Sequence, residues 1–345
     1  MRRYLCVCLA MCLCAGLLLG GCACAPTAPS TKDNNCLTVI CTTYAAKEIA
    51  VALTSGWDDL PEGHGYDALQ IQMLGQAGRD IHSYEPTAAD LVSLYNADLF
   101  IYVGDTAEPW VANALAAVGG DGTSVDMMTM CHDALLPMDH HEDTCSPEPG
   151  HSHDHDHDGD ETYDEHVWMS LRNMMTMTAA VSQSLVQIAP HATELIRQNE
   201  QAYLAELAAL DAAYTAVVEG GARRAIMIAD RNPFAYLMHD YGITAHAAFS
   251  GCSSETEASF ATQTRLIETV ETLDLPYIFQ TEGGASSVAS TLSSTTGADV
   301  LTLHACQVMT EEERGSASYL EIMAQNLESL KKALWTEGLS ASKAK

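Results

Sequence analysis

Short apolar runs rich in β-branched residues alternate along the chain with stretches in which apolar residues recur at helical spacing. The runs predicted as strands are 36–41, 69–74, 99–103, 225–229, 244–249, 277–280 and 300–303. The stretches predicted as helices are 87–95, 169–188, 191–219, 234–241, 257–273, 288–295 and 319–335, with a further helix beginning near Tyr44. Strands that alternate with helices indicate parallel sheets covered by helices on both faces. The predicted fold class is therefore α/β.

One long helix separates the two groups of strands. It follows Pro190 and stops before Gly220 and Gly221, as helices commonly do. At about 1.5 Å per residue it is about 43 Å long, which suits a rigid spacer. The chain has 345 residues, which is long for one small core. We therefore predict two lobes, each with a parallel sheet flanked by helices, joined by this helix; one large α/β domain is the alternative. The predicted boundaries are 36–189 for the N-terminal lobe, 190–219 for the linker helix, 220–337 for the C-terminal lobe and 338–345 for a tail.

The N-terminus has the pattern of an export signal. Arg2 and Arg3 precede an uncharged apolar stretch that closes with Leu19-Gly20-Gly21-Cys22. This ending resembles a bacterial lipobox, so we predict a signal peptide over 1–21, lipidation of Cys22 and a flexible tether over 22–35. An uncleaved membrane anchor is the alternative. No other stretch approaches the roughly 20 apolar residues of a membrane span. We expect an exported protein, lipid-anchored on the outer face of the cytoplasmic membrane or periplasmic.

The net charge narrows the class of partner. The chain carries 46 acidic and 16 basic residues, a formal charge of −30, while 47% of its residues are apolar and can build real cores. Such a surface repels nucleic acid and anionic lipid and attracts cations. We therefore expect no nucleic-acid partner, and we expect a monomer. The charge does not say which cation is bound.

Residues 132–166 interrupt the α/β pattern. They hold eight of the fourteen histidines and twelve carboxylates with very few apolar residues, so we predict a mobile surface loop rather than a packed element. One interpretation is a low-affinity zinc collector; a solvated acidic linker is the other. The predicted loop ligands for metal are His140, His141, His151, His153, His155 and His157.

Two histidines occupy positions where an α/β lobe presents ligands. His82 follows a predicted strand and precedes a helix, and His166 stands at the exit of the acidic loop. Neutral imidazole is a preferred donor for zinc, and strand-to-helix loops face the crevice in which α/β proteins bind ligands. Taken alone, a histidine in either position is more often a polar surface residue than a metal ligand.

The surrounding residues resemble a known family. His82-Ser-Tyr-Glu-Pro-Thr87 resembles the first ligand motif of the metal-binding lipoproteins of zinc and manganese ABC importers, the ZnuA and AdcA type. Glu165-His166-Val-Trp168 resembles their second motif, and the histidine loop lies between the two, as in zinc members. The resemblance covers about 37–335. It implies two lobes with metal bound in the cleft between them, two ligands from each lobe, and delivery to an ABC permease with its ATPase.

The second lobe departs from the family pattern. The third ligand of the family, His or Glu, would fall on Arg231, whose guanidinium cannot bind a metal. Asp230 beside it is the predicted substitute; alternatively Arg231 pairs with a carboxylate and water completes the site. His304 stands after the last strand, where the resemblance implies the fourth ligand. Three imidazoles with one carboxylate favour Zn(II) over Mn(II), although nickel and copper also accept imidazole.

Two cysteines follow strands of the second lobe. Cys252 and Cys306 are predicted either to form a disulfide or to leave a free thiol near the site. The alternative functions are a manganese receptor, a metal-buffering or adhesion lipoprotein, and an exported zinc hydrolase. The chain contains no His-Glu-x-x-His, no Gly-x-Ser-x-Gly and no glycine-rich phosphate loop, so no enzyme is expected.

Overall fold

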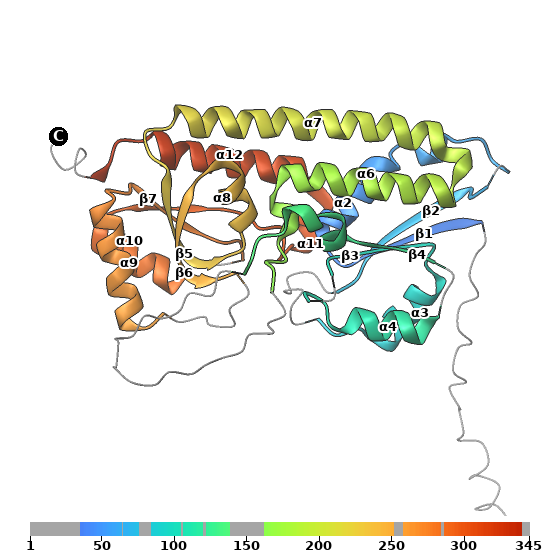
Figure 1. Ribbon diagram of the computed structural model, residues 1–345, viewed down its shortest axis with the longest axis horizontal. Coiled ribbons are helices and arrows are strands. Elements are labelled where there is room, and N and C mark those ends of the chain that lie inside the picture. Colours follow the sequence, from blue (N-terminus) through green and yellow to red (C-terminus); the bar gives the residue numbers. More distant parts are fainter. Residues whose placement is uncertain are drawn as a thin grey trace, which may run out of the picture. The chain divides into compact units, whose positions relative to one another are not determined.

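The computed structural model describes residues 35–63, 65–75, 84–104, 106–119, 122–138, 162–251, 258–283 and 286–339. All of them fall within one compact unit, Asn34–Lys345. Within these ranges the chain forms two four-stranded sheets flanked by helices (Figure 1). The predicted α/β class with two lobes is confirmed. None of the described helices is long and apolar enough to cross a membrane.

The first lobe is built on a sheet of order β2-β1-β3-β4 in which every neighbouring pair is parallel. Its strands are β1 (Cys36–Cys41), β2 (Ala68–Met73), β3 (Leu99–Tyr102) and β4 (Thr123–Asp126). Its helices are α2 (Tyr44–Leu53), α3 (Ala88–Asn96), α4 (Trp110–Val118) and the single turn α5 (Met127–Met130). Strand β4 and helices α4 and α5 are additions to the elements that the sequence predicts.

Alternation of side chains explains how this sheet is covered. Leu99 and Ile101 of β3 belong to the large core shared with α2, whereas Phe100 and Tyr102 face a smaller core with α3 and α4. Successive residues of a strand point to opposite faces, so both faces are buried. This is why the strand reads as a continuous apolar run.

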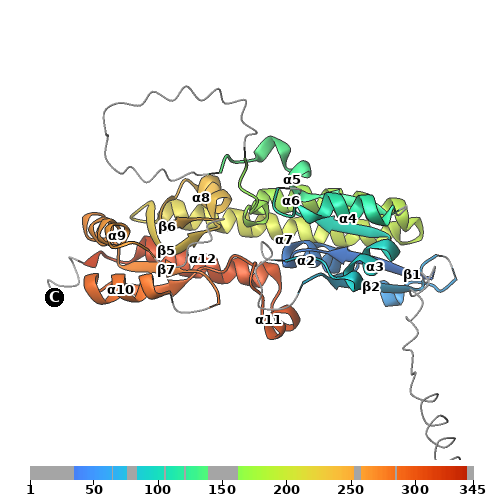
Figure 2. The ribbon, with the colours of Figure 1, turned by 90° about the horizontal axis from the view of Figure 1, so that it is seen from below.

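The second lobe repeats the architecture with the order β6-β5-β7-β8, again all parallel. Its strands are β5 (Ala225–Asn232), β6 (Thr244–Ser250), β7 (Tyr277–Gln280) and β8 (Asp299–Thr302). Its helices are α8 (Ala235–Tyr241), α9 (Phe260–Thr272), α10 (Ser287–Thr296), α11 (Glu311–Ser316) and α12 (Tyr319–Trp335). Met227 and Ala229 pack with α9 and α10, while Ile226 and Ile228 face the large core. Figure 2 shows α9 and α10 beside the strands of this sheet.

Two long helices connect the lobes in the chain. Helix α6 (Leu171–Ile188) is followed by a short 3-10 turn, Pro190–Ala192, and then by α7 (Thr193–Gly220). Helix α7 has 28 residues and is therefore about 42 Å long. It contacts α6 and α2 of the first lobe and α12 of the second. Figure 1 shows α7 running alongside α6 and α12. The predicted spacer is thus packed along both lobes.

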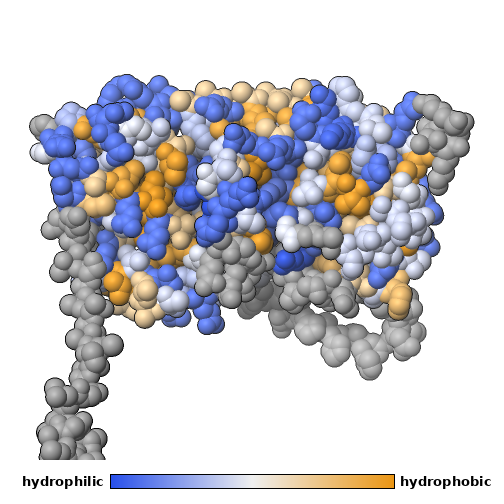
Figure 3. Space-filling view, turned by 180° about the vertical axis from the view of Figure 1, so that it is seen from behind, coloured by the Kyte–Doolittle hydropathy of each residue, from blue (hydrophilic) through white to orange (hydrophobic). Residues whose placement is uncertain are grey.

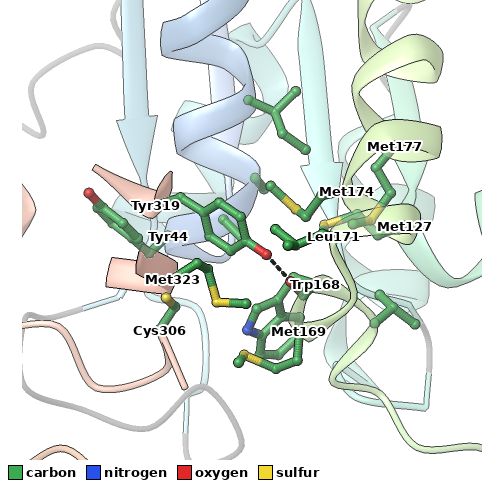
Figure 4. Close-up of a cluster of buried hydrophobic side chains, with 14 of the residues drawn as sticks. Tyr44, Met127, Trp168, Met169, Leu171, Met174, Met177, Cys306, Tyr319 and Met323 are labelled. Atoms are coloured by element: carbon green, nitrogen blue, oxygen red, sulfur yellow. Dashed lines mark hydrogen bonds between the residues drawn. The ribbon is translucent and has the colours of Figure 1, made fainter. Parts of the chain in front are cut away.

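Both lobes contribute to the largest core. Trp168 is fully buried, its Nε1 donates to the backbone oxygen of Ala305 at 2.8 Å, and its own backbone oxygen accepts from the hydroxyl of Tyr319 at 2.6 Å. Figure 4 shows Trp168 and Tyr319 joined in this way within a cluster rich in methionine. The Trp168 ring also lies edge-on to the His166 ring, with the ring centroids 5.3 Å apart. On the face shown in Figure 3, apolar residues form separate patches between hydrophilic ones.

Candidate metal centre

His166 is held by a buried carboxylate two residues before it. The imidazole is fully buried, and its Nδ1 lies 2.9 Å from Oδ1 of Asp164, which also accepts the His166 backbone N–H at 2.9 Å. A carboxylate accepts hydrogen bonds, so Nδ1 carries the hydrogen and the lone pair is on Nε2. Carboxylate–histidine pairs of this kind orient metal ligands and raise their basicity.

Asp164 is itself held in place by burial of its side chain and by hydrogen bonds of its backbone. Its side chain is 7% exposed, and its backbone oxygen accepts from the hydroxyl of Tyr236 in α8 at 2.6 Å. Its backbone N–H donates to the oxygen of Leu136 at 2.8 Å, next to an isolated bridge between Pro137 and Tyr163. The two described ends of the predicted surface loop are therefore ordered, because they pair with each other beside His166. The segment between them, 139–161, lies outside the described residues.

Two residues of the second lobe approach the His166 ring. A Cβ atom on Gly251, directly after β6, would lie 3.1 Å from Cε1 of His166 and 2.8 Å from the backbone oxygen of Asn232, so the ring needs glycine there. Gln307, in the loop after β8, brings its Nε2 to 2.8 Å from Nε2 of His166. The lone-pair side of the imidazole therefore faces the second lobe.

His304 follows β8 as predicted, but its ring nitrogens have other neighbours. Nδ1 accepts the backbone N–H of Cys306 at 2.9 Å, so in this arrangement the hydrogen is on Nε2. Nδ1 lies 3.6 Å from Oε1 of Glu282, and Nε2 lies 3.6 Å from Oε1 of Glu313. The structure thus places His304 between two carboxylates.

Asp230 was expected after a strand that ends at residue 229, but it lies inside β5 and is hydrogen-bonded within its own lobe. One carboxylate oxygen accepts the backbone N–H of Arg231 at 2.8 Å, and the other accepts the Thr281 hydroxyl at 2.7 Å. The pairing of β5 with β6 gains one extra residue between Ile228 and Arg231. A bulge of this kind re-aims side chains, and here it accompanies the turn of Asp230 toward the end of β7.

A buried glutamate fixes the loop that carries Gln307. Glu282 accepts the backbone N–H of Ala305 at 2.7 Å, that of Gln307 at 3.0 Å and that of Val308 at 3.2 Å. Cys306 in the same loop has a positive φ of 59°, and burial raises the pKa of its thiol well above the ordinary value. Cys306 is a free thiol, and its predicted partner Cys252 lies outside the described residues.

The described residues give a partial view of the predicted ligand set. Over the ranges that the structure covers, no three His, Cys, Asp or Glu side chains lie together as a metal site, so His166, His304 and Asp230 do not form one cluster. His82 and the six loop histidines lie outside those ranges, as does Cys22. Gln307 was not among the predicted ligands. Its position after the last strand is a usable signal, but an amide is a weak indicator of metal binding, and the resemblance implies the fourth ligand at His304, directly after that strand.

Comparison with known proteins agrees with the architecture. A family model described as zinc-uptake complex component A, periplasmic, matches residues 51–333. The chain is 31% identical to the zinc-binding lipoprotein AdcA of Streptococcus pneumoniae over 273 residues, which is 79% of this chain and 53% of that protein. It is 27% identical to the high-affinity zinc uptake system protein ZnuA of Bacillus subtilis, over 78% of this chain and 82% of that protein.

Solved structures of similar proteins superpose on this chain. The crystal structure of Zn(II)-bound AdcA from Streptococcus pneumoniae has a TM-score of 0.68 at 26% identity, over 88% of this chain and 58% of that chain. The metal-dependent lipoprotein YcdH from Bacillus subtilis has a TM-score of 0.69 at 24% identity, over 86% of this chain and 99% of that one, which shows the fold. The chain spans about half the length of the AdcA relatives that it matches.

Proposed function

The chain belongs to the family of zinc-uptake complex component A proteins, and we propose that it is an extracytoplasmic receptor that binds Zn(II) and delivers it to an ABC permease with its ATPase. The observation that carries the proposal is His166, a buried imidazole oriented by Asp164 with its Nε2 lone pair toward the second lobe. A buried histidine with a carboxylate on one nitrogen has the arrangement of a metal ligand. The metal is the cargo, and no catalytic role is proposed.

We place the zinc between the lobes, with His82 and His166 as the donors from the first lobe. His304 and Asp230 are the candidate donors from the second lobe, since His304 follows β8 and Asp230 lies near the end of β5. Each would have to release a present partner, the Cys306 N–H for His304 and the Thr281 hydroxyl for Asp230. Histidine donors favour zinc over manganese, which prefers more oxygen.

Single substitutions test these second-lobe donors. If His304 binds zinc directly, His304→Ala should weaken zinc binding severely, while Asp230→Ala should weaken it less because water can replace a carboxylate. His239→Ala is the matched control, since that imidazole is 67% exposed on α8. Chelator competition on the three variants measures the affinity. Wild-type affinity in His304→Ala would remove His304 from the site.

The remaining parts of the proposal concern residues outside the described ranges. We propose that the six histidines of 139–161 collect zinc weakly, because unrestrained ligands must be ordered on binding. We also propose that Cys22 is lipidated and anchors the protein on the outer face of the cytoplasmic membrane. The receptor is proposed to act as a monomer. The sequence pattern supports the first two of these points.

Growth under zinc limitation tests the function itself. A strain that lacks this gene should grow poorly when a chelator lowers free zinc, and added zinc should restore growth. Wild-type protein should also restore growth, whereas His166→Ala should not, because one buried ligand is lost. His239→Ala should behave as wild type. Full growth of the deletion strain under the chelator, or rescue by manganese rather than zinc, would contradict a zinc-uptake role.

A further inference from the structure

The hydroxyl of Tyr236 is built into a short antiparallel backbone pairing of the first lobe. Leu136 and Asp164 flank the bridge between Pro137 and Tyr163, at the position where an antiparallel pair exchanges two N–H···O bonds. One of these bonds is direct, from the Asp164 N–H to the Leu136 oxygen at 2.8 Å. The other runs through Tyr236, which accepts the Leu136 N–H at 3.2 Å and donates to the Asp164 oxygen at 2.6 Å. A side chain of the second lobe therefore completes a backbone pair of the first.

The same helix, α8, makes a second contact on the other side of His166. Asp240 comes four residues after Tyr236 and hence lies on the same face of the helix. Its carboxylate accepts the Ser170 hydroxyl at 2.5 Å, and Ser170 is the N-cap of α6. Between these two contacts α8 packs against the 3-10 turn that joins His166 to Ser170. His166 thus lies between two points of the chain that one helix holds.

We propose that α8 is the support from the second lobe that positions His166 for the metal. Tyr236 acts through the backbone of Asp164, whose carboxylate accepts the Nδ1–H of His166. Asp240 acts through Ser170, at which α6 begins. Burial raises the pKa of Tyr236, so its hydroxyl keeps its proton and stays a donor at neutral pH. This inference rests on the proposed function and adds two positioning residues to it.

The two contacts fix the backbone on both sides of His166, so they reduce the ordering that metal binding must bring about. A preorganised site binds more tightly because less conformational freedom is lost on binding. Tyr236→Phe keeps the ring and removes the hydroxyl, so the Asp164 backbone is no longer held from the second lobe. The zinc dissociation constant should therefore rise about 2- to 10-fold, which corresponds to the net worth of one neutral hydrogen bond. Asp240→Ala should raise it as well, because Ser170 loses its acceptor.

Two matched controls remove equivalent bonds elsewhere in the chain. Tyr214→Phe also loses a buried hydroxyl that donates to a backbone oxygen at 2.6 Å, in this case that of Met323 in α12. Glu200→Ala also removes a carboxylate that accepts a serine hydroxyl, that of Ser182 at 2.8 Å. The Glu200 side chain is 12% exposed and that of Asp240 is 13% exposed. Both controls should lose stability and keep wild-type zinc affinity, because neither bond lies in the segment that α8 holds.

Chelator competition on the full chain measures the zinc affinity of the tightest site, and urea unfolding of the metal-free proteins gives the stability of each variant. A second readout is the Nδ1–H resonance of His166 in a nitrogen-15 spectrum of the metal-free protein, assigned by its loss in His166→Ala. It should shift in Tyr236→Phe and in Asp240→Ala and stay in place in both controls. A general loss of stability would not produce this difference.

The outcomes separate the two proposals. Weaker zinc binding and a shifted resonance in both α8 variants, with both controls as wild type, support the role of α8. Wild-type affinity in Tyr236→Phe, or an equal loss of affinity in Tyr214→Phe, would overturn it and leave the zinc receptor in place. If Tyr236→Phe does not fold, Asp240→Ala and Glu200→Ala decide in the same way. Failure of the wild-type protein to bind zinc would overturn the proposed function, and this inference with it.

Discussion

Replacing Asp164 by asparagine isolates the charge that orients His166. In the structure, one carboxylate oxygen accepts both Nδ1–H and the backbone N–H of His166, each at 2.9 Å. The oxygen of an asparagine can accept the same two hydrogens, so the shape and the bonds are retained while the negative charge is lost. We therefore expect Asp164→Asn to fold and to bind zinc less tightly.

The magnitude follows from burial. The His166 side chain is fully buried and that of Asp164 is 7% exposed, so water screens the pair weakly. Hydrogen bonds to a charged group are worth about 1.5–3 kcal/mol, and part of that is gained only when the metal draws positive charge onto the imidazole. Loss of such a partner lowers metal affinity by roughly 10- to 100-fold. We expect Asp164→Asn to weaken zinc binding by a factor in this range.

Chelator competition measures the effect, with Asp126→Asn as the matched control. Asp126 caps α5 by accepting the N–H of Thr129 at 2.9 Å, and asparagine caps a helix about equally well. Urea unfolding of the metal-free proteins separates stability from affinity. Wild-type zinc affinity in Asp164→Asn would refute the argument that the carboxylate tunes His166.

Three further predictions concern other parts of the chain. Burial raises the pKa of Glu108 from 4.5 to about 7, so the folded protein holds a proton there that the unfolded chain releases, and stability is lost as pH rises through this window. Glu108→Gln lacks this proton, so between pH 5 and pH 8 its free energy of unfolding should rise relative to that of wild type by up to about 3 kcal/mol, measured by urea unfolding at both pH values. No relative gain would contradict the raised pKa. Deleting 139–161 should remove weak zinc equivalents and keep the tight site in calorimetry, and loss of the tight site would mean that the ligands are misassigned. Cys22→Ser should abolish incorporation of labelled fatty acid, and equal labelling would refute lipidation.

The elements with a strong local pattern could be predicted from the sequence. Helix α3 begins after Thr87, where Thr87 and Asp90 form the capping box that its spacing indicates. Helix α7 ends at Gly220, and all seven predicted strands are present within a residue or two of their expected bounds, apart from the three-residue extension of β5. These features are local, since caps, glycines and apolar runs act over a few residues. The parallel topology follows from their alternation.

Elements without such a pattern were missed. Strand β4 has four residues, of which only Val125 is buried, so no apolar run marks it. It forms because β3 offers an unpaired edge, which is a tertiary cause. The short helix α11 has no buried residue, so no apolar stripe marks it; it begins with the capping box of Thr310 and Glu313.

In the candidate site, the motif around His166 is local in the sequence, whereas the contacts of the second lobe are not. His166 was identified from its motif, and burial beside Asp164 is consistent with that role. The engagement of His304 with Cys306 and Glu282, and the contact of Gln307 with His166, depend on how the loop after β8 folds on its own backbone. Side-chain direction in such a loop is set by non-local hydrogen bonds, which spacing in the sequence does not encode.

The central claim is that this chain carries one tight zinc site that includes His166. The most direct measurement is metal analysis of chain lacking 139–161 after dialysis against equal concentrations of zinc and manganese, with His166→Ala in parallel. We predict a single zinc per chain, little manganese, and loss of that zinc in His166→Ala. Manganese in place of zinc, or zinc retained in full by His166→Ala, would contradict the account.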